Sequence, residues 1–329
     1  MSTTTLSQVA PGVQAFYDRN LLERAQPAEV HGRFGQKRPI SQRSGNQIKF
    51  RRYSQLAAAT TALTEGVTPG GSALAVTDIT ATLAQYGDFV TLSDMVSLTN
   101  QDPVVTEATD VLGDQAGTTI DQVRRDVLVA GTSVAYANAV AGRTSVNVKI
   151  SSTDLDKVIR ALKLQNAKFM KDGIMPTDKV GTGAIRKAFI GIVHPDVEFD
   201  LEGITGYRAV SDYGSQEGVI EDEIGAYKNI RFVSSTNAKI ISGGGAAGTT
   251  VYKNNGSNFD VYCSLFFAAN AYGICPLSGN ALNTYVKALG SAGSADPLEQ
   301  RSTVGWKATT TTKILNEAWM YRLESAASL

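Results

Sequence analysis

The sequence predicts an α+β fold organised around one long amphipathic helix. Residues 103–130 carry apolar side chains at steps of three and four, which places them on one helical stripe: Val104, Ala108, Val111, Leu112, Ala116, Ile120, Val123, Val127 and Ala130. The shorter helices and strands predicted after this segment do not alternate regularly, which favours α+β over a doubly wound sheet. With 329 residues, 43% hydrophobic and 19% charged, the chain has the composition of a folded protein with a sizeable core.

The predicted helix has recognisable ends and an acidic outer face. Asp102 can cap its free amides, Pro103 suits the first helical position, and Gly131 can end it. The face opposite the apolar stripe has only two bases, Arg124 and Arg125, against the acids Glu107, Asp110, Asp114, Asp121 and Asp126. We expect the stripe to hold the chain's own sheet. The acidic face is then either solvated or available to another chain.

The segment before this helix is predicted to be an arm followed by a projecting hairpin. In the arm, residues 1–45, a short helix is plausible at 13–24 before prolines and glycines interrupt the chain. Residues 46–53 and 73–90 are rich in residues typical of strands, and a polar, glycine-rich tip at 60–72 joins them. Because an isolated two-stranded hairpin is marginally stable in water, we expect this one to rest on something else.

The segment after the long helix is predicted to mix short strands with two helices. The helices are expected at 154–171 and 197–201, the second following the turn formed by His194, Pro195 and Asp196. Strands are expected at 145–150, 188–193, 230–233, 258–268, 271–276, 282–289 and 305–314.

Charge is unevenly distributed along a chain whose net charge is zero. Residues 30–64 contain no acid but carry Arg33, Lys37, Arg38, Arg43, Lys49, Arg51 and Arg52, whereas residues 65–130 contain ten acids and two bases. Such a division allows one segment to pair with the other, within a chain or between chains. Contact of the basic run with nucleic acid is the alternative, although few aromatic residues interleave with it and no recognised nucleic-acid motif frames it.

Candidate catalytic and ligand-binding patterns are few. Gly243, Gly245 and Gly248 match G-x-G-x-x-G, but no predicted helix follows them to receive a dinucleotide phosphate. His194 lies beside Asp196 without an identifiable nucleophile, so a turn histidine is expected. The acidic run 221–223 lacks a calcium-loop pattern and is expected to be a solvated loop. We therefore predict no catalytic residue, no cofactor and no metal.

The sequence shows neither a recognisable targeting signal nor a cysteine spacing typical of a disulfide framework. The two cysteines lack metal-site spacing and are expected to be reduced, structural thiols. No signal peptide opens the sequence and no apolar run is long enough to span a bilayer, so we expect a protein that is neither secreted by the usual route nor embedded in a membrane.

The ordered features resemble the major capsid proteins of tailed bacteriophages, specifically the N-four-type podophages and their relatives. The resemblance rests on the order and spacing of six stretches: Ala15–Leu22, Ile48–Tyr53, Leu63–Val67, Gln85–Asp94, His194–Asp196 and Gly225–Asn237. The resemblance implies the Hong Kong phage capsid fold. In that fold this chain would have an N-terminal arm at 1–45, an E-loop hairpin at 46–92, a P-domain with its spine helix at 93–150, an A-domain at 151–303, and a return to the P-domain at 304–329.

The function implied by the resemblance is structural. Such subunits are not enzymes; they assemble as hexamers and pentamers into an icosahedral virion capsid around double-stranded DNA, and their arms and E-loops overlap neighbouring copies. Assembly in the bacterial host cytoplasm, with a portal and with separate scaffolding or decoration proteins, would follow. The lysine used for covalent crosslinking in the founding member has no counterpart here, because residues 54–72 contain no lysine.

The charge division and the resemblance together predict the residues that contact neighbouring subunits. These are Arg43, Lys49, Arg51, Arg52, Glu65, Glu107, Asp110, Asp114 and Asp121. Because Arg51 and Arg52 are adjacent in an extended strand, their side chains point to opposite faces, and we expect one of them to meet the acidic helix of a neighbour. Three alternatives remain open at this point: an encapsulin-type shell that stores enzymes, an unrecognised α/β enzyme, and a DNA-binding protein that uses the basic arm.

Overall fold

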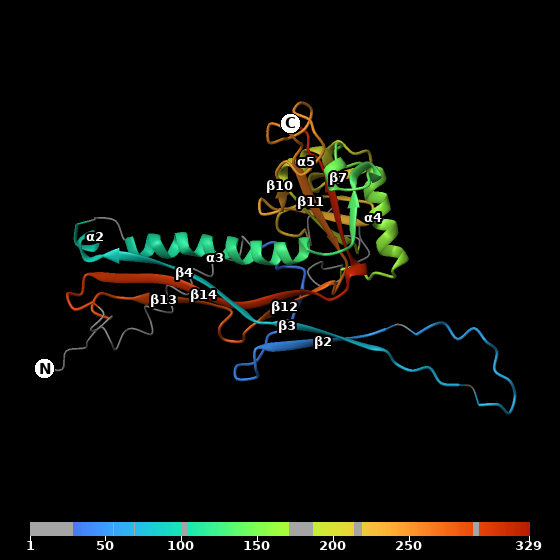
Figure 1. The fold of residues 1–329 in the computed structure, drawn as a ribbon, viewed down its shortest axis with the longest axis horizontal. Helices are drawn as coiled ribbons and strands as arrows, with labels where there is room; N and C mark the ends of the chain where they lie inside the picture. The colour runs from blue at the N-terminus through green and yellow to red at the C-terminus, as the bar shows by residue number, and fades with distance from the viewer. Residues whose placement is uncertain are drawn as a thin grey trace.

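The computed structural model describes residues 29–54, 56–68, 70–99, 104–170, 187–213, 219–291 and 296–329. The predicted α+β fold is confirmed, with two sheets and a separate hairpin. Figure 1 shows the long helix α3 (Val104–Val129) lying along one sheet, a compact second unit near the end of that helix, and a hairpin that projects away from the body.

The first sheet has five strands and is organised by β14 (Arg301–Ile314). One edge of β14 pairs antiparallel with β4 (Ala84–Ser93), and the other edge pairs with β12 (Tyr272–Pro276) and β13 (Leu282–Lys287) in succession. The two-residue strand β1 (Gln36–Lys37) adds in parallel to β12 and brings the described part of the arm to the sheet edge.

Helix α3 covers one face of this sheet through a small apolar core. Leu112, Ala116 and Ile120 of the helix pack against Val304, Trp306 and Ala308 of β14. The predicted stripe is correct for these three helical residues and wrong for Val111, which is 65% exposed. The buried stripe is rotated because it also contains polar residues with buried partners, including Asp121 and Arg124. The predicted caps Asp102 and Pro103 lie outside the described residues.

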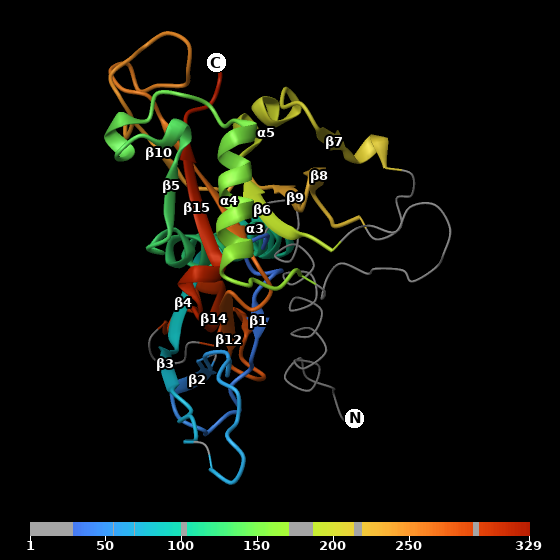
Figure 2. The same cartoon turned by 90° about the vertical axis from the view of Figure 1, so that its right-hand side faces the viewer.

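The second sheet has eight strands and forms the compact unit whose strands are spread side by side across the view in Figure 2. Its strand order is β5 (Val134–Tyr136), β15 (Met320–Ser325), β11 (Val261–Phe267), β6 (Phe189–Val193), β9 (Ile230–Ser234), β8 (Glu223–Tyr227) and β7 (Tyr207–Ala209), with β10 (Ile240–Ile241) paired to β11. Strand β6 is a continuous apolar run and every residue of β11 is buried, as expected for a sheet that is covered by other elements.

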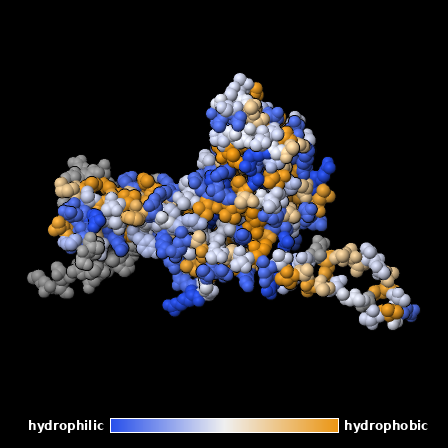
Figure 3. Space-filling view, viewed as in Figure 1, coloured by the Kyte–Doolittle hydropathy of each residue, from blue (hydrophilic) through white to orange (hydrophobic). Residues whose placement is uncertain are grey.

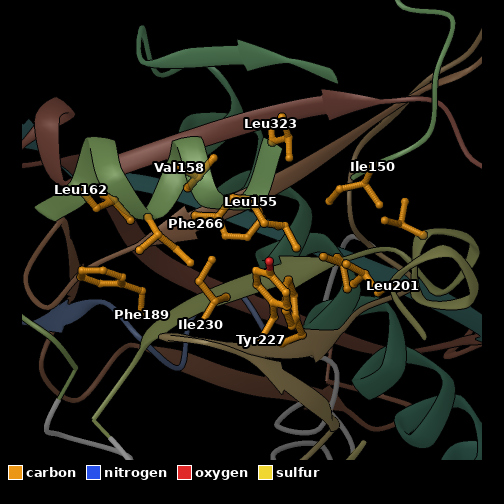
Figure 4. Packing of buried hydrophobic residues seen from close by; sticks show 14 of the residues in the cluster. Ile150, Leu155, Val158, Leu162, Phe189, Leu201, Tyr227, Ile230, Phe266 and Leu323 are labelled. Atoms are coloured by element: carbon orange, nitrogen blue, oxygen red, sulfur yellow. The ribbon is translucent and has the colours of Figure 1, made fainter. Parts of the chain in front are cut away.

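Helix α4 (Ser152–Leu164) covers part of the second sheet and completes the largest core. Its first turn is capped by Ser151, whose side chain accepts a hydrogen bond from the Asp154 backbone N–H. Leu155, Val158 and Leu162 face the sheet, where they pack in one cluster with residues such as Phe189 and Phe266 (Figure 4). The remaining helical segments are α2 (Asp94–Thr99), α5 (Pro195–Glu202) and the short turns η2 (Ala137–Ala139), η3 (Arg143–Ser145), η4 (Val210–Asp212) and η6 (Glu317–Trp319).

Several predicted boundaries are wrong. The second run of the hairpin is two strands, because β3 (Val76–Thr82) pairs with β2 (Gln47–Tyr53) whereas β4 joins the five-stranded sheet. The strand expected at 145–150 is a 3₁₀ turn followed by a single bridge between Lys149 and Ala326. The helix expected to reach residue 171 ends at Leu164.

Each sheet draws strands from distant parts of the chain. Strands β12 and β13, from within 151–303, lie in the five-stranded sheet. Strands β5 and β15, from within 93–150 and 304–329, lie in the eight-stranded sheet. The expected division into 93–150, 151–303 and 304–329 stays a prediction. No helix among the described residues is both long and apolar enough to cross a membrane.

Candidate subunit-contact surfaces

The root of the hairpin is fixed to the body by one apolar and one polar contact. The Phe50 ring lies against Gly273 of β12, where an added Cβ would come within 2.8 Å of the ring. Arg52 donates a hydrogen bond of 2.9 Å to the side-chain oxygen of Asn316, in the connection between β14 and β15. The root is therefore held at the junction of the two sheets.

Arg51 and Arg52 are adjacent in β2, so their side chains point to opposite faces of the hairpin and have different surroundings. Arg51 lies opposite Asp78 in the hairpin register and donates to its carboxylate at 3.0 and 3.2 Å. This bond lowers the pKa of the Asp78 carboxyl. Arg52 has the neutral Asn316 amide as a partner, and no carboxylate of the described residues lies within ion-pair distance of it. Of the two, Arg52 is therefore the better candidate for an acidic partner outside the subunit.

The tip of the hairpin exposes large apolar side chains. Residues 56–68 and 70–75 contain no helix or strand. Leu63, Val67 and Leu74 are 76%, 63% and 66% exposed. The projecting loop in Figure 3 has orange surface mixed with polar surface. No described part of the chain covers these three side chains. Exposed apolar groups gathered on a projecting segment are typical of a surface that contacts another molecule.

The acidic face of α3 is shorter than predicted. Glu107 and Asp114 are exposed and Asp110 is half-buried, so these three remain candidates for contacts between subunits. Asp121 is fully buried, and its prediction as an intersubunit contact is wrong. Its carboxylate is bound inside its own chain by the arm, which no sequence pattern near residue 121 indicated.

Asp121 is the acceptor of a buried hydrogen-bond junction. His31 approaches from the arm, and both its backbone N–H and its Nδ1 bond to the Asp121 carboxylate, at 2.7 and 2.8 Å. Asn237, from the loop after β9, donates its side-chain amide to the same carboxylate at 3.2 Å. The Tyr272 hydroxyl of β12 donates to the His31 carbonyl at 2.7 Å. The junction therefore connects the arm, α3 and both sheets.

Two flanking ion pairs strengthen the same region. Arg124, one helical turn after the junction, is bound to Glu29 of the arm. Arg33 of the arm is within 3.3 Å of Glu221 and 3.1 Å of Asp222, in the turn before β8. Arg33 of the arm is thus neutralised within its own subunit, by acids outside the acidic segment 65–130. The pairing of the basic and acidic segments within one chain, which the charge division allowed, is seen between Arg51 and Asp78.

The other predicted contact residues are exposed and stay predictions. Arg43 lies in the turn between the arm and β2, where its φ of 66° is left-handed. Lys49 lies on β2, and its positive charge helps to lower the pKa of Asp78. Glu65 lies in a turn at the hairpin tip. None of the three is brought to the acidic face of α3 within the subunit.

The candidate catalytic and ligand-binding patterns have structural roles. His194 caps α5, with Nδ1 accepting a hydrogen bond of 3.2 Å from the Asp196 backbone N–H. Burial lowers the His194 pKa, which favours the neutral imidazole that this cap requires. No helix follows the glycines at 243–248. In the run 221–223, Glu223 is buried against Arg231 and is not in a solvated loop. The described residues contain no cluster suited to a metal ion.

Comparison with known proteins decides the family. A family model described as "Phage capsid protein" matches residues 76–323, which is well over half of the chain. The chain belongs to the phage capsid protein family. Its role is therefore that of a structural subunit of a virion capsid, and assembly into a multimeric shell follows from that role. No curated protein matches the sequence significantly.

Solved capsid structures share the fold of this capsid protein at low sequence identity. The capsid of Ralstonia phage GP4 superposes with a TM-score of 0.67 at 12% identity, covering 90% of each chain. The head of Helicobacter pylori bacteriophage KHP40 gives 0.61 at 14% identity, covering 90% of this chain and 88% of the other. The capsid of cyanophage P-SCSP1u gives 0.58 at 15% identity, covering 89% and 87%.

The buried junction predicts that two acids of α3 differ sharply in their effect on stability. Asp121→Asn removes a charge that three donors share, so we expect it to lower the free energy of unfolding by about 2–3 kcal/mol. The matched variant Glu107→Gln, on the exposed face, should change it by less than about 0.5 kcal/mol. Urea denaturation of the free subunits measures both values. Equal effects of the two substitutions would contradict the assignment of Asp121 to the junction.

Proposed function

We propose that this capsid protein forms the hexamers and pentamers of an icosahedral shell around double-stranded DNA, and that the hairpin is its E-loop. In this proposal α3 is the spine helix, the five-stranded sheet belongs to the P-domain, and the eight-stranded sheet belongs to the A-domain. The shell assembles in the host cytoplasm with a portal and separate scaffolding or decoration proteins. The zero net charge is consistent with non-specific, weak contact with the packaged DNA.

One observation carries the assignment of the hairpin. Its strands project from the body and its tip exposes Leu63, Val67 and Leu74, which no described part of the subunit covers. A two-stranded hairpin with uncovered apolar side chains is marginally stable by itself. A neighbouring copy in a shell supplies the missing surface. Because each subunit both gives and receives this contact, weak individual contacts add up over a closed shell.

Arg52 supports a second, electrostatic contact between copies. It is exposed, it lies at the hairpin root, and it has no carboxylate partner among the described residues. The exposed acids of α3, Glu107 and Asp114, are the complementary surface on a neighbour. An exposed ion pair contributes about 1 kcal/mol or less by itself, so its importance lies in orientation and repetition.

Removing the tip should separate folding from assembly. Every described residue of Thr64–Gly71 is exposed, so deleting this segment should change the free energy of unfolding by less than about 1 kcal/mol while shells no longer form. The double substitution Leu63→Ser with Val67→Ser keeps the loop length and should also impair assembly. Thr60→Ala in the same loop is the matched control. Circular dichroism follows folding and electron microscopy counts shells.

Recovery of normal shells from the deletion would overturn the assignment of the hairpin as an intersubunit element. Loss of folding in the deletion but not in the double substitution would show instead that the shortened loop strains its strands.

Reversing the charge of Arg52 should block assembly without unfolding the subunit. Arg52→Glu loses one exposed hydrogen bond, so we expect a stability cost of about 1 kcal/mol or less. Lys49→Glu makes the same charge change on the opposite face of β2 and should impair assembly less. A compensating Glu107→Lys or Asp114→Lys on α3 should partly restore shells. Light scattering during assembly measures all four variants.

Normal assembly by Arg52→Glu would contradict the ion pair. If the reversal abolishes duplex binding by the free subunit but leaves shell formation intact, the basic residue serves the genome rather than the neighbour.

A further inference from the structure

The face of the five-stranded sheet that points away from α3 carries two exposed aromatic side chains in one row. Trp306 of β14 packs against α3, so its neighbour Gly305 lies on the opposite face. Gly305 pairs with Phe89 of β4 on one side and with Tyr285 of β13 on the other. Residues directly opposite each other in antiparallel strands share a face. Phe89 is 66% exposed and Tyr285 is 48% exposed.

This row forms an aromatic groove, with Phe89 and Tyr285 as its walls and Gly305 as its floor. Two strand spacings, about 10 Å, separate the backbones of the two walls. The floor has no side chain, and a second glycine, Gly87, lines the same hollow of about 410 Å³. Aliphatic side chains can therefore enter between the two rings. Aromatic residues that line such hollows are frequent anchors of protein interfaces.

One positive charge stands beside the aromatic groove. Lys307 follows Gly305 by two residues and therefore lies on the same face of β14, where it is exposed. No carboxylate of the described residues lies within ion-pair distance of Lys307, and no acid occupies this face of β4, β13 or β14. The nearby acid Asp88 is turned toward α3, where it accepts a hydrogen bond from Gln115. The groove therefore suits an apolar partner that carries one negative charge.

The hairpin tip has this combination of groups. The Val67 backbone N–H donates to the Thr64 carbonyl at 3.2 Å, which closes a turn with Gly66 at a φ of 77°. Leu63 and Val67 flank the turn and are exposed. Glu65, inside the turn, is the one charged residue between positions 56 and 75. The turn thus presents two aliphatic side chains and one carboxylate together.

We propose that the turn at the hairpin tip of a second copy docks in the aromatic groove. Leu63 and Val67 pack against the two rings, and Glu65 lies beside Lys307. Figure 1 shows β13 at one end of the molecule and the hairpin tip at the other, so a subunit cannot fill its own groove. Each copy gives a tip and offers a groove, and such a heterologous contact can close into a ring. This inference rests on the proposed assembly role of the hairpin and specifies the surface that covers its tip.

A charge exchange tests the polar half of the contact. Lys307→Glu and Glu65→Lys each bring like charges together, so each should slow assembly about fivefold or more in light scattering. The double variant restores opposite charges and should recover most of the rate. Glu65→Lys combined with Lys157→Glu, an exposed position of α4, is the matched control and should show no recovery.

Crosslinking of shells tests the apolar half. In a chain with Leu63→Cys and Tyr285→Cys, a short bis-maleimide should link neighbouring copies in assembled shells and leave unassembled subunits monomeric. The natural cysteines Cys263 and Cys275 are both buried, so they contribute little background. Leu63→Cys with Phe199→Cys, on the exposed side of α5, is the control pair and should not crosslink.

Four results would overturn the proposal. If both single charge variants assemble normally, or shells form without the crosslink, while deletion of the tip still blocks assembly, the hairpin serves assembly through another surface. If the tip deletion also assembles normally, the proposed function of the hairpin fails as well. Crosslinks within unassembled monomers would place the tip on its own chain. If deletion of residues 1–28, and not of the tip, exposes the Tyr285→Cys thiol of shells to alkylation, the arm fills the groove.

Discussion

The architecture of this capsid protein depends on the buried carboxylate of Asp121. Three donors from two segments reach it: the backbone and ring of His31 in the arm, and the Asn237 amide in the loop after β9. Because Asp121 itself lies on α3 and His31 is held in turn by Tyr272 of β12, the junction sets the helix against both sheets. A buried charge without these donors would be strongly unfavourable, so the arm must be in place for α3 to pack as it does.

The subunit consists of a body, held together by this junction, and a hairpin. In the body the large apolar groups and the buried ions have partners within the chain, whereas the tip of the hairpin does not. In the body, most large apolar side chains are buried in clusters, and the buried ions Glu223 and Arg231 are paired. The hairpin root contacts the body through residues that include Phe50 and Arg52, while its tip is not covered by the described residues. The exposed apolar side chains of the hairpin tip are unfavourable for an isolated subunit in water. They become favourable when neighbouring copies of the subunit cover them.

Local patterns predicted the elements whose periodicity or apolar run is strong, and failed where the outcome depended on distant partners. Helix α3 and the strands β6, β11 and β14 were predicted because their patterns are unambiguous over many residues. The burial of Asp121 was not, since its partner His31 is 90 residues away and a carboxylate on a helix is usually exposed. The division of the hairpin's second run at Leu83 was also missed, because both halves are extended and only their pairing differs. The same limit applies to β15, whose sequence cannot specify which sheet it joins.

The candidate contact surface was predicted in part for the same reasons. Composition alone identified the tip, and strand geometry placed Arg51 and Arg52 on opposite faces. The two arginines differ because Arg51 is paired with Asp78, which lies opposite it in the hairpin. This pairing could be identified only once the strand register was known.

The claim that a neighbouring copy completes the hairpin is tested most directly by electron microscopy of the expressed chain. The account predicts closed shells or hexameric sheets in which residues 56–68 and 70–75 are ordered against an adjacent subunit. Particles that remain monomeric under conditions that favour assembly, or shells in which the tip of the hairpin touches no neighbour, would contradict it.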